Sequence, residues 1–293
     1  HNALIFSLFL VASSIGLFVV KGLNLGIDFK GGILIEARNT TGPADVSGLR
    51  ADLGQLRLGD INLQEFGTPT DVLVRVQRQE GDEEAQIAAI AAISSTLGDA
   101  YDIRRTEFVG PPVGAELAEK GMLAVACALL AIMVYIWFRF EWQFSIAAIL
   151  ALAHDVLSTV GLFALTSFEF NLATVAAILT IAGYSINDTV VVFDRVRENL
   201  RRYKSYEIED IINKSLNETL SRTVMTSFTT LLALLAITIF GGAVLRDFAL
   251  AMIWGVLIGT YSSIFVAVGF LSRFDIRHQE PDDGVDVPET ERS

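Results

Sequence analysis

Asp188 and Arg222 place opposite charges in or beside apolar stretches, where charge is costly. Asp188 lies within the run 170–193, which is otherwise mostly apolar and long enough to cross a bilayer. An aspartate at the centre of a membrane helix costs about 2.5 to 3.5 kcal/mol on insertion scales, so it is expected to have a function and a partner. Arg222 stands directly before the next apolar run and can supply that partner from a neighbouring helix.

His154 and Asp155 form a second ionisable group in an apolar run. Asp155 lies about 16 Å from the start of the run 144–168, which places it near the midplane of a bilayer. Because histidine titrates near neutrality, the two residues together can relay protons. The alternative is that they fix the register of a contact between helices.

Six apolar runs must position these groups. The chain has 293 residues, of which 52% are hydrophobic and 19% charged, and this composition indicates a membrane protein. The sequence predicts a multi-pass α-helical protein with six transmembrane helices, within 3–20, 121–138, 144–168, 170–193, 223–245 and 248–271. We expect the first run to be a retained span, because it is longer than a signal-peptide core and no cleavage pattern follows it.

A polar region separates the first two runs, and we expect it to form a small α+β domain of the ferredoxin-like kind. Alternating and helical patterns predict strands at 31–36, 71–77 and 101–108, with helices at 45–56 and 82–97. The predicted division is a transmembrane helix at 1–21, the polar domain at 22–118, helices 2 to 6 at 119–273 with a basic segment at 195–221, and an acidic tail at 274–293.

Basic residues in the short loops set the orientation. Arg139, the segment 195–214 and the start of the tail carry most of them, whereas the opposite loops around Glu169 and around 246–247 have one. The positive-inside rule then places both termini in the cytoplasm and the polar domain outside. The net charge of −12 argues against nucleic-acid binding, which requires clustered Lys and Arg.

This orientation puts Asp188 about 9 Å inside the cytoplasmic end of its helix, six residues before Asp194. Asp188 could instead sit in a hydrated lip, paired with Arg195. Arg222 could be a basic anchor whose side chain extends to lipid phosphates. The mixed charges at 194–198 predict a solvated network at a helix end.

Small residues recur at steps of three and four on three of the predicted membrane helices. Such stripes allow membrane helices to approach closely and to form hydrogen bonds across their interface. They are Ala173, Ala176, Thr180, Gly183 and Asn187; Ala147, Ala151, His154, Ser158 and Gly161; and Gly255, Gly259 and Ser263.

Several motifs in this order resemble the SecD/SecF family of bacterial protein export, itself similar to the RND superfamily of proton-driven transporters. They are Gly-Ile-Asp-Phe-Lys-Gly-Gly at 26–32, Val-Gly-Pro-Pro-Val-Gly at 109–114, His-Asp at 154–155 and the segment 183–199, which begins Gly-Tyr-Ser-Ile-Asn-Asp. The match is to the smaller member of the family and extends from the first span to about Arg222.

The resemblance implies roles for particular residues. It assigns proton coupling to Asp188 and Arg222, within the motif that includes Gly183 and Asn187. We add His154 and Asp155 as candidates for the same path. It further implies a location in the bacterial cytoplasmic membrane, with SecD, the SecYEG translocon, YajC and preproteins as partners.

Residues that flank the polar domain are candidates for a hinge. Glycine allows positive φ angles or close backbone approach where the chain enters the domain, and proline stiffens the return connection. We predict that two strands at this joint transmit motion, the alternative being a static entry to the sheet. The candidates are Gly26, Asp28, Gly31, Gly32, Gly110 and Pro111.

Three functions remain open from the sequence. The leading one is a subunit that uses the proton motive force, with SecD, to promote preprotein translocation and release. The others are an assembly subunit whose buried charges fix helix register, and an RND-type exporter of small molecules. We expect no enzymatic activity, cofactor or metal site, because no nucleotide-binding motif and only three histidines are present.

Overall fold

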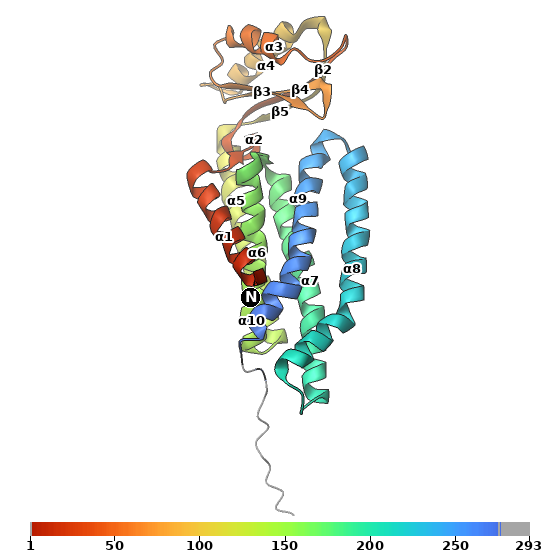
Figure 1. The fold of residues 1–293 in the computed structure, drawn as a ribbon. Coiled ribbons are helices and arrows are strands. Elements are labelled where there is room, and N and C mark those ends of the chain that lie inside the picture. The colour runs from red at the N-terminus through yellow and green to blue at the C-terminus, as the bar shows by residue number, and fades with distance from the viewer. Residues whose placement is uncertain (1, 275, 277–293) are drawn as a thin grey trace, which may run out of the picture.

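A bundle of long helices carries a small sheet-containing domain at one end (Figure 1). The structure is a computed structural model that describes residues 2–274 and 276. Six helices are long and apolar enough to cross a membrane, which confirms the predicted spans. The bundle consists of α1 (Asn2–Lys21), α5 (Pro111–Arg139), α6 (Trp142–Thr166), α7 (Leu172–Arg202), α8 (Ile208–Phe240) and α9 (Gly242–Tyr261), which continues through the π-helical turn η2 (Ser262–Ala267) into α10 (Val268–Leu271).

The turn between the last two spans lies earlier than predicted. Helix α8 ends at Phe240, and Arg246 and Asp247 lie inside the first turns of α9 instead of in a loop. One residue suffices for the turn, because the amide of Gly241 donates to the carbonyl of Ile237 at 2.7 Å and closes the last turn of α8. The prediction of a loop around 246–247 was therefore wrong.

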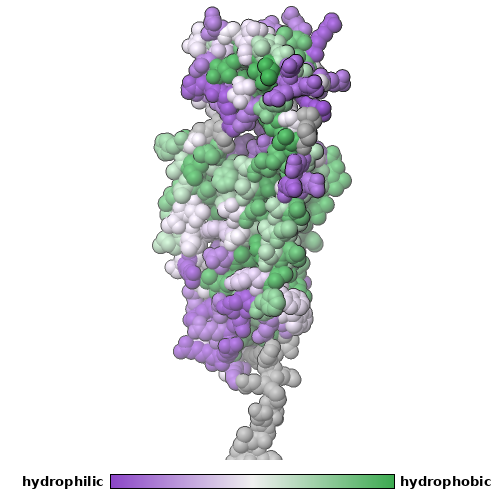
Figure 2. Space-filling model, turned by 180° about the vertical axis from the view of Figure 1, so that it is seen from behind, coloured by the Kyte–Doolittle hydropathy of each residue, from purple (hydrophilic) through white to green (hydrophobic). Residues whose placement is uncertain are grey.

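Helices α6, α7 and α9 form the interior of the bundle, and α1, α5 and α8 lie around them. The first three bury far more of their residues than the outer three. The outer helices expose large apolar side chains, among them Phe9, Phe138 and Phe240. Figure 2 shows the result as an apolar belt between two hydrophilic ends, which is the surface that a bilayer requires.

The domain between α1 and α5 is a four-stranded antiparallel sheet with two helices. The strand order is β3-β4-β2-β5, and Ile33, Ile35, Val74, Leu53 and Ile93 fill the core between sheet and helices. The predicted strands and helices are all present, but β3 was not predicted. The elements are β2 (Gly32–Asn39), α3 (Val46–Gly54), β3 (Ile61–Phe66), β4 (Thr68–Val76), α4 (Glu83–Leu97), η1 (Gly98–Ala100) and β5 (Tyr101–Val109).

Three short elements join this domain, called the β domain below, to the bundle. They are β1 (Asn24–Leu25), α2 (Ile27–Lys30) and β6 (Glu169–Phe170). Strand β1 follows the first span and pairs in parallel with β6, which lies between α6 and α7. Segments more than 140 residues apart thus meet where the helices end.

Candidate functional site

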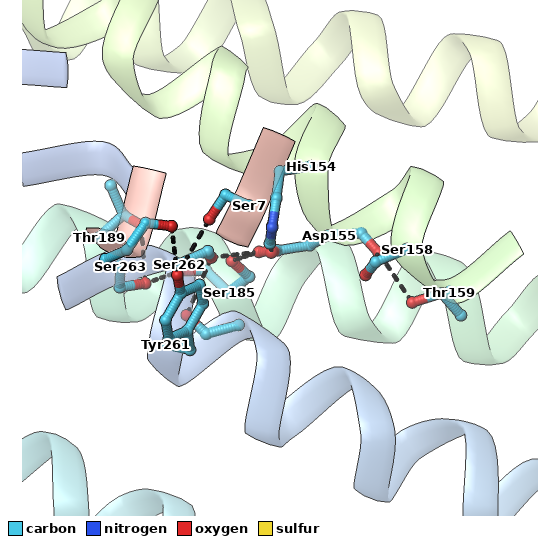
Figure 3. A network of polar contacts seen from close by, with 12 residues as sticks. Ser7, His154, Asp155, Ser158, Thr159, Ser185, Thr189, Tyr261, Ser262 and Ser263 are labelled. Carbon is cyan, nitrogen blue, oxygen red and sulfur yellow. Dashed lines mark hydrogen bonds and ion pairs between the residues drawn. The ribbon is translucent and has the colours of Figure 1, made fainter. Parts of the chain in front are cut away.

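Asp155 is the centre of a buried polar cluster in the middle of the bundle (Figure 3). It is 0% exposed and lies near the middle of α6. Its Oδ2 accepts hydrogen bonds from Ser185 of α7 and, at 2.6 Å, from Ser262 of η2. Its Oδ1 lies 2.9 Å from Nδ1 of His154. One carboxylate therefore joins all three interior segments of the bundle.

The hydroxyl groups around Asp155 continue along the contact between α7 and η2. Ser262 and Ser263 are both fully buried in the π-helical turn. Ser263 lies 2.9 Å from the hydroxyl of Thr189, and it donates to the carbonyl of Ser185 at 3.3 Å. Single π-helical turns inside longer helices are frequent at functional sites, and here the turn brings two adjacent serines to the same cluster.

His154 keeps one ring nitrogen free within the described part of the chain. Its Nδ1 faces Asp155, whereas its buried Nε2 has no hydrogen-bond partner there. The ring lies 6.2 Å from that of Tyr261, whose hydroxyl donates to the carbonyl of Ala3 at 2.7 Å and lies 3.1 Å from the hydroxyl of Ser7. A histidine with a carboxylate on one nitrogen and a free second nitrogen is able to exchange a proton.

Asp188 lies on α7, one turn beyond Ser185, and is only 4% exposed. Its Oδ2 has no hydrogen-bond partner among the described residues. Arg222 of α8 lies close enough for a Coulombic interaction with this carboxylate, but the two form no direct ion pair. Thr223, next to Arg222, also buries a hydroxyl that has no partner within the described part of the chain. The structure thus brings the predicted acid and base near each other without joining them.

The alternative pairing of Asp188 with Arg195 is wrong. Arg195 instead donates at 2.6 Å to Glu218 and, at the same distance, to Glu198. Asp194 accepts from Arg139 at 2.6 Å. The mixed charges at the end of α7 therefore form the predicted network, and this network does not include Asp188.

Glycine is favoured near the β domain for two different reasons, positive φ angles and close contacts of the backbone. Gly31 and Gly32 have φ angles of 71° and 130°, which favour glycine, and a Cβ on Gly32 would lie 2.7 Å from the carbonyl oxygen of Val76. Gly26 has an ordinary φ of −70°, but its backbone lies against the side chain of Glu169. A second contact brings Gly31 close to the carbonyl oxygen of Val109.

Gly110 and Pro111, the other two hinge candidates, lie where the chain leaves the β domain. Gly110 is extended and directly precedes α5, and Pro111 is the first residue of that helix. Proline at this position costs no intrahelical hydrogen bond, because the first amides of a helix have no partner within it. The chain therefore passes from the β domain directly into the helix that forms the second span.

Asp28 connects this joint to α7. Its Oδ2 accepts a hydrogen bond from the amide of Leu172, at the first turn of α7, at 2.9 Å. The amide of Gly26 also donates to the carbonyl of Phe170 at 2.9 Å. These bonds hold the exit of the first span to the start of the helix that carries Asp188.

An ion pair between Arg75 of β4 and Glu169 of β6 ties the β domain to the same place. Burial raises the pKa of Glu169, and the neighbouring Arg75 guanidinium opposes that rise. Neither this pair nor the hydrogen bonds of Ser185 and Ser262 to Asp155 were predicted from the sequence. Two adjacent serines in an apolar span were the available signal for the cluster around Asp155, whereas nothing local marks Arg75.

The small-residue stripes behave differently on different helices. Gly255 and Gly259 of α9 pack on Ile181 and Ser185 of α7, and the stripe on α6 is buried. The predicted stripe on α7 is exposed in this chain, and nothing lies within 4 Å of a Cβ on Gly183. Its members are Ala173, Ala176, Thr180, Gly183 and Asn187.

The fold and the site define a class: a multi-pass membrane protein whose helices bury ionisable side chains and hold a small β domain at one end. Comparison with known families agrees. Residues 89–277 match "Protein export membrane protein SecD/SecF, C-terminal", and residues 16–38 match "SecD/SecF GG Motif". The chain therefore belongs to the SecD/SecF family, among its SecF members.

Curated relatives support this placement. The chain is 50% identical over 266 residues to protein translocase subunit SecF of Magnetococcus marinus, covering 89% of this chain and 85% of the relative. It is 46% identical over 253 residues to the SecF of Rickettsia akari, covering 86% and 82%.

Solved structures agree as well. A crystal structure of SecDF from Thermus thermophilus matches with a TM-score of 0.83 and 38% identity, over 93% of this chain but only 37% of the length of that one. SecDF in a super-membrane-facing form matches with the same identity over 92% of this chain, at a TM-score of 0.66.

Proposed function

We propose that the chain is a transport subunit, not an enzyme, that uses the proton motive force with SecD to promote preprotein translocation and release. The relatives are named as protein translocase subunits, and the SecDF chain has ample additional length for a second half. The observation that carries the proposal is Asp188, a carboxylate buried in the helix bundle, with Arg222 nearby and with one oxygen that has no partner among the residues that the structure describes. Such a group can take up and release a proton at small structural cost.

Two candidate proton-binding sites, Asp155 with His154 on α6 and Asp188 on α7, lie close together along α7. Ser185 contacts Asp155, and Asp188 follows three residues later, a rise of about 4.5 Å. Asp155 and His154 lie deeper in the membrane, and Asp188 lies nearer the basic end of the bundle. Neutralising Asp188 removes its attraction to Arg222, so α7 and α8 are free to shift relative to each other.

Helix α7 can carry such a shift to the β domain. From Asp188 to Leu172 it spans about 24 Å, and its first turn is bonded to Asp28. Arg75 and Glu169 add a direct link to the sheet. The two SecDF structures match this chain with equal identity and similar coverage but with TM-scores of 0.83 and 0.66, so the matched region differs in conformation between them.

The β domain is, in this proposal, a ferredoxin-like domain outside the cytoplasm. Its order of elements is β-α-β-β-α-β, and its antiparallel sheet places the first strand between the third and the fourth, as that class of fold does. The basic residues at the opposite end of the bundle support cytoplasmic termini in the bacterial inner membrane.

SecD is the partner that we assign to the exposed stripe of α7. Small and polar residues facing lipid gain little, whereas against another helix they permit close packing. This stripe lies on the helix that carries Asp188, so a SecD acid is able to approach the same region. SecYEG and YajC are proposed as further partners on the family resemblance alone.

A charge exchange separates this function from a purely structural role. In the double variant Asp188→Arg/Arg222→Asp, we expect assembly with SecD to be retained and export to fail, because the proton-binding acid has moved to another helix. Recovery of both assembly and export favours the assembly subunit instead. Asp210→Asn, an exposed change at the start of α8, is the matched control and is expected to leave both unchanged.

A further inference from the structure

A basic cavity lies at the end of the bundle opposite the β domain. It has a volume of about 540 Å³ and is formed where the end of α5 meets the last turns of α7. Four arginines and two acids line it, which leaves an excess of two positive charges. The lining residues are Arg139, Asp194, Arg197, Glu198, Arg201 and Arg202.

Much of the hydrogen-bonding capacity of these arginines is unused. Arg139 donates from one terminal nitrogen to both carboxylate oxygens of Asp194, at 2.6 and 2.8 Å. Arg197 makes one long hydrogen bond of 3.4 Å to the carbonyl of Arg139, and its guanidinium lies 5.7 Å from the centroid of the Phe140 ring. Arg201 and Arg202 are exposed and form no ion pair with any residue that the structure describes. Guanidinium groups with free donors match a phosphate, which they can bind with two parallel hydrogen bonds.

The cavity lies at the level of lipid headgroups. Trp137 and Phe138, directly before Arg139, are 61% and 85% exposed, and Trp142 at the start of α6 is 52% exposed. Exposed aromatic residues at the end of a membrane span mark the boundary between hydrocarbon and headgroups. The cavity therefore has cationic donors on one side and an apolar, lipid-facing surface beside it. A phospholipid can contact both surfaces, whereas a free anion needs only the donors.

We propose that this cavity binds the headgroup of an anionic phospholipid. Its phosphate lies against Arg197 and Arg201, one helical turn apart on α7, and its acyl chains follow the exposed face of α5 at Trp137 and Phe138. Arg202 adds to the positive field. Basic cavities between membrane helices on the cytoplasmic side are suited to such lipids. The site is separate from Asp188 and does not depend on the export function.

The test measures thermal stabilisation of the full-length chain in detergent on titration with phosphatidylglycerol, phosphatidylcholine or inorganic phosphate. Wild-type protein is expected to be stabilised by phosphatidylglycerol well below the concentration at which the other two act. In Arg201→Gln/Arg202→Gln, we expect the apparent affinity for phosphatidylglycerol to fall about 10- to 30-fold, since each basic residue near an anionic lipid contributes about 1 kcal/mol.

Arg273→Gln, an exposed change at the end of α10 on the same side of the bundle, is the control and is expected to keep the wild-type affinity. Equal affinities of the double variant and wild type overturn the proposal, as does an equal loss in Arg273→Gln, which indicates general surface attraction. Stabilisation by inorganic phosphate at the same concentration as the lipid assigns the cavity to a free anion and also overturns it. Both variants alter exposed side chains, and their melting temperatures without lipid verify folding.

Discussion

The amide of Leu172 donates to the carboxylate of Asp28 at 2.9 Å and thereby joins two segments that are 144 residues apart. Asp28 lies just after the first span, and Leu172 begins α7. A carboxylate at the first turn of a helix is favourable because it pairs with free amides and with the positive end of the helix dipole. The joint below the β domain is therefore attached to the helix that carries Asp188.

Replacing Asp28 tests this attachment. In Asp28→Ala, we expect amide hydrogen exchange at 172–175 to become faster and export to decrease, because a lost capping interaction costs about 1 kcal/mol. Asp28→Asn keeps an acceptor and should have an intermediate effect. The control is Asp45→Ala, which removes the side-chain cap of α3 in the β domain. Unchanged exchange at the start of α7 in Asp28→Ala would contradict the link.

The sequence predicted the elements whose signals are local. Six apolar runs gave the spans, and alternation gave β2, β4 and β5. The pairing of β1 with β6 escaped prediction because each strand has two residues and the partners are far apart in sequence. The turn at Gly241 was misplaced because two charged residues, Arg246 and Asp247, suggested a loop, whereas they lie inside the first turns of α9.

The site was predicted only in part for the same reason. Asp155, His154 and Asp188 stand out as ionisable residues in apolar runs, and all three are buried. The donors to Asp155 come from Ser185 and Ser262, on two other segments, so only the packed structure reveals them. The exposed stripe on α7 shows that a small-residue pattern need not be matched by a helix of the same chain.

Two substitutions of Asp155 separate charge from structure. Asp155→Ala leaves the hydroxyl of Ser185 without its buried acceptor, whereas that of Ser262 keeps the carbonyl of Gly259 at 3.1 Å, so we expect the protein to lose about 1 to 3 kcal/mol for the unpartnered group. Asp155→Asn keeps an acceptor oxygen and should retain most of this stability while it removes the titratable group. Thermal unfolding in detergent measures both. Equal destabilisation by the two variants would show that the charge, and not the hydrogen bonding, holds the cluster together.

The link between Arg75 and Glu169 is expected to loosen as pH falls. Burial raises the pKa of Glu169, and the nearby guanidinium of Arg75 opposes this rise. The negative charges of Asp28, Asp247 and Glu107 raise the pKa of Glu169 further. The folded state then binds this proton more readily than the unfolded chain. The cost of the buried charge is therefore present in full above the folded pKa and is relieved as pH falls through it, and the ion pair is lost over the same range.

Spin labels can follow this change. With Cys127→Ser as background, labels at Gln55 in the β domain and at Thr166 at the end of α6 report the distance across the joint. We expect the distance distribution to broaden on acidification, and to be broad at all pH values in Glu169→Gln.

The ion pair of Arg38 and Asp71 within the β domain is the reference. A hydrogen bond from Arg38 lowers the pKa of Asp71, so this pair stabilises the domain at neutral pH and is lost only as pH falls through that lowered pKa. We therefore expect the Arg75–Glu169 pair to be lost at a higher pH than the Arg38–Asp71 pair. A distribution of inter-label distances that stays narrow until the β domain itself unfolds would contradict this order.

Proton flux in vesicles that contain the chain and SecD measures whether proton uptake at Asp188 drives export, as proposed. Under an imposed pH gradient, we expect wild type and the exposed-site control Asp210→Asn to show preprotein-dependent proton flux and to complete export. Asp188→Asn should assemble with SecD but show neither, and Asp188→Glu should retain part of both because it keeps a titratable carboxylate. Wild-type flux and export by Asp188→Asn, at equal amounts of assembled complex, would rule out this role of Asp188.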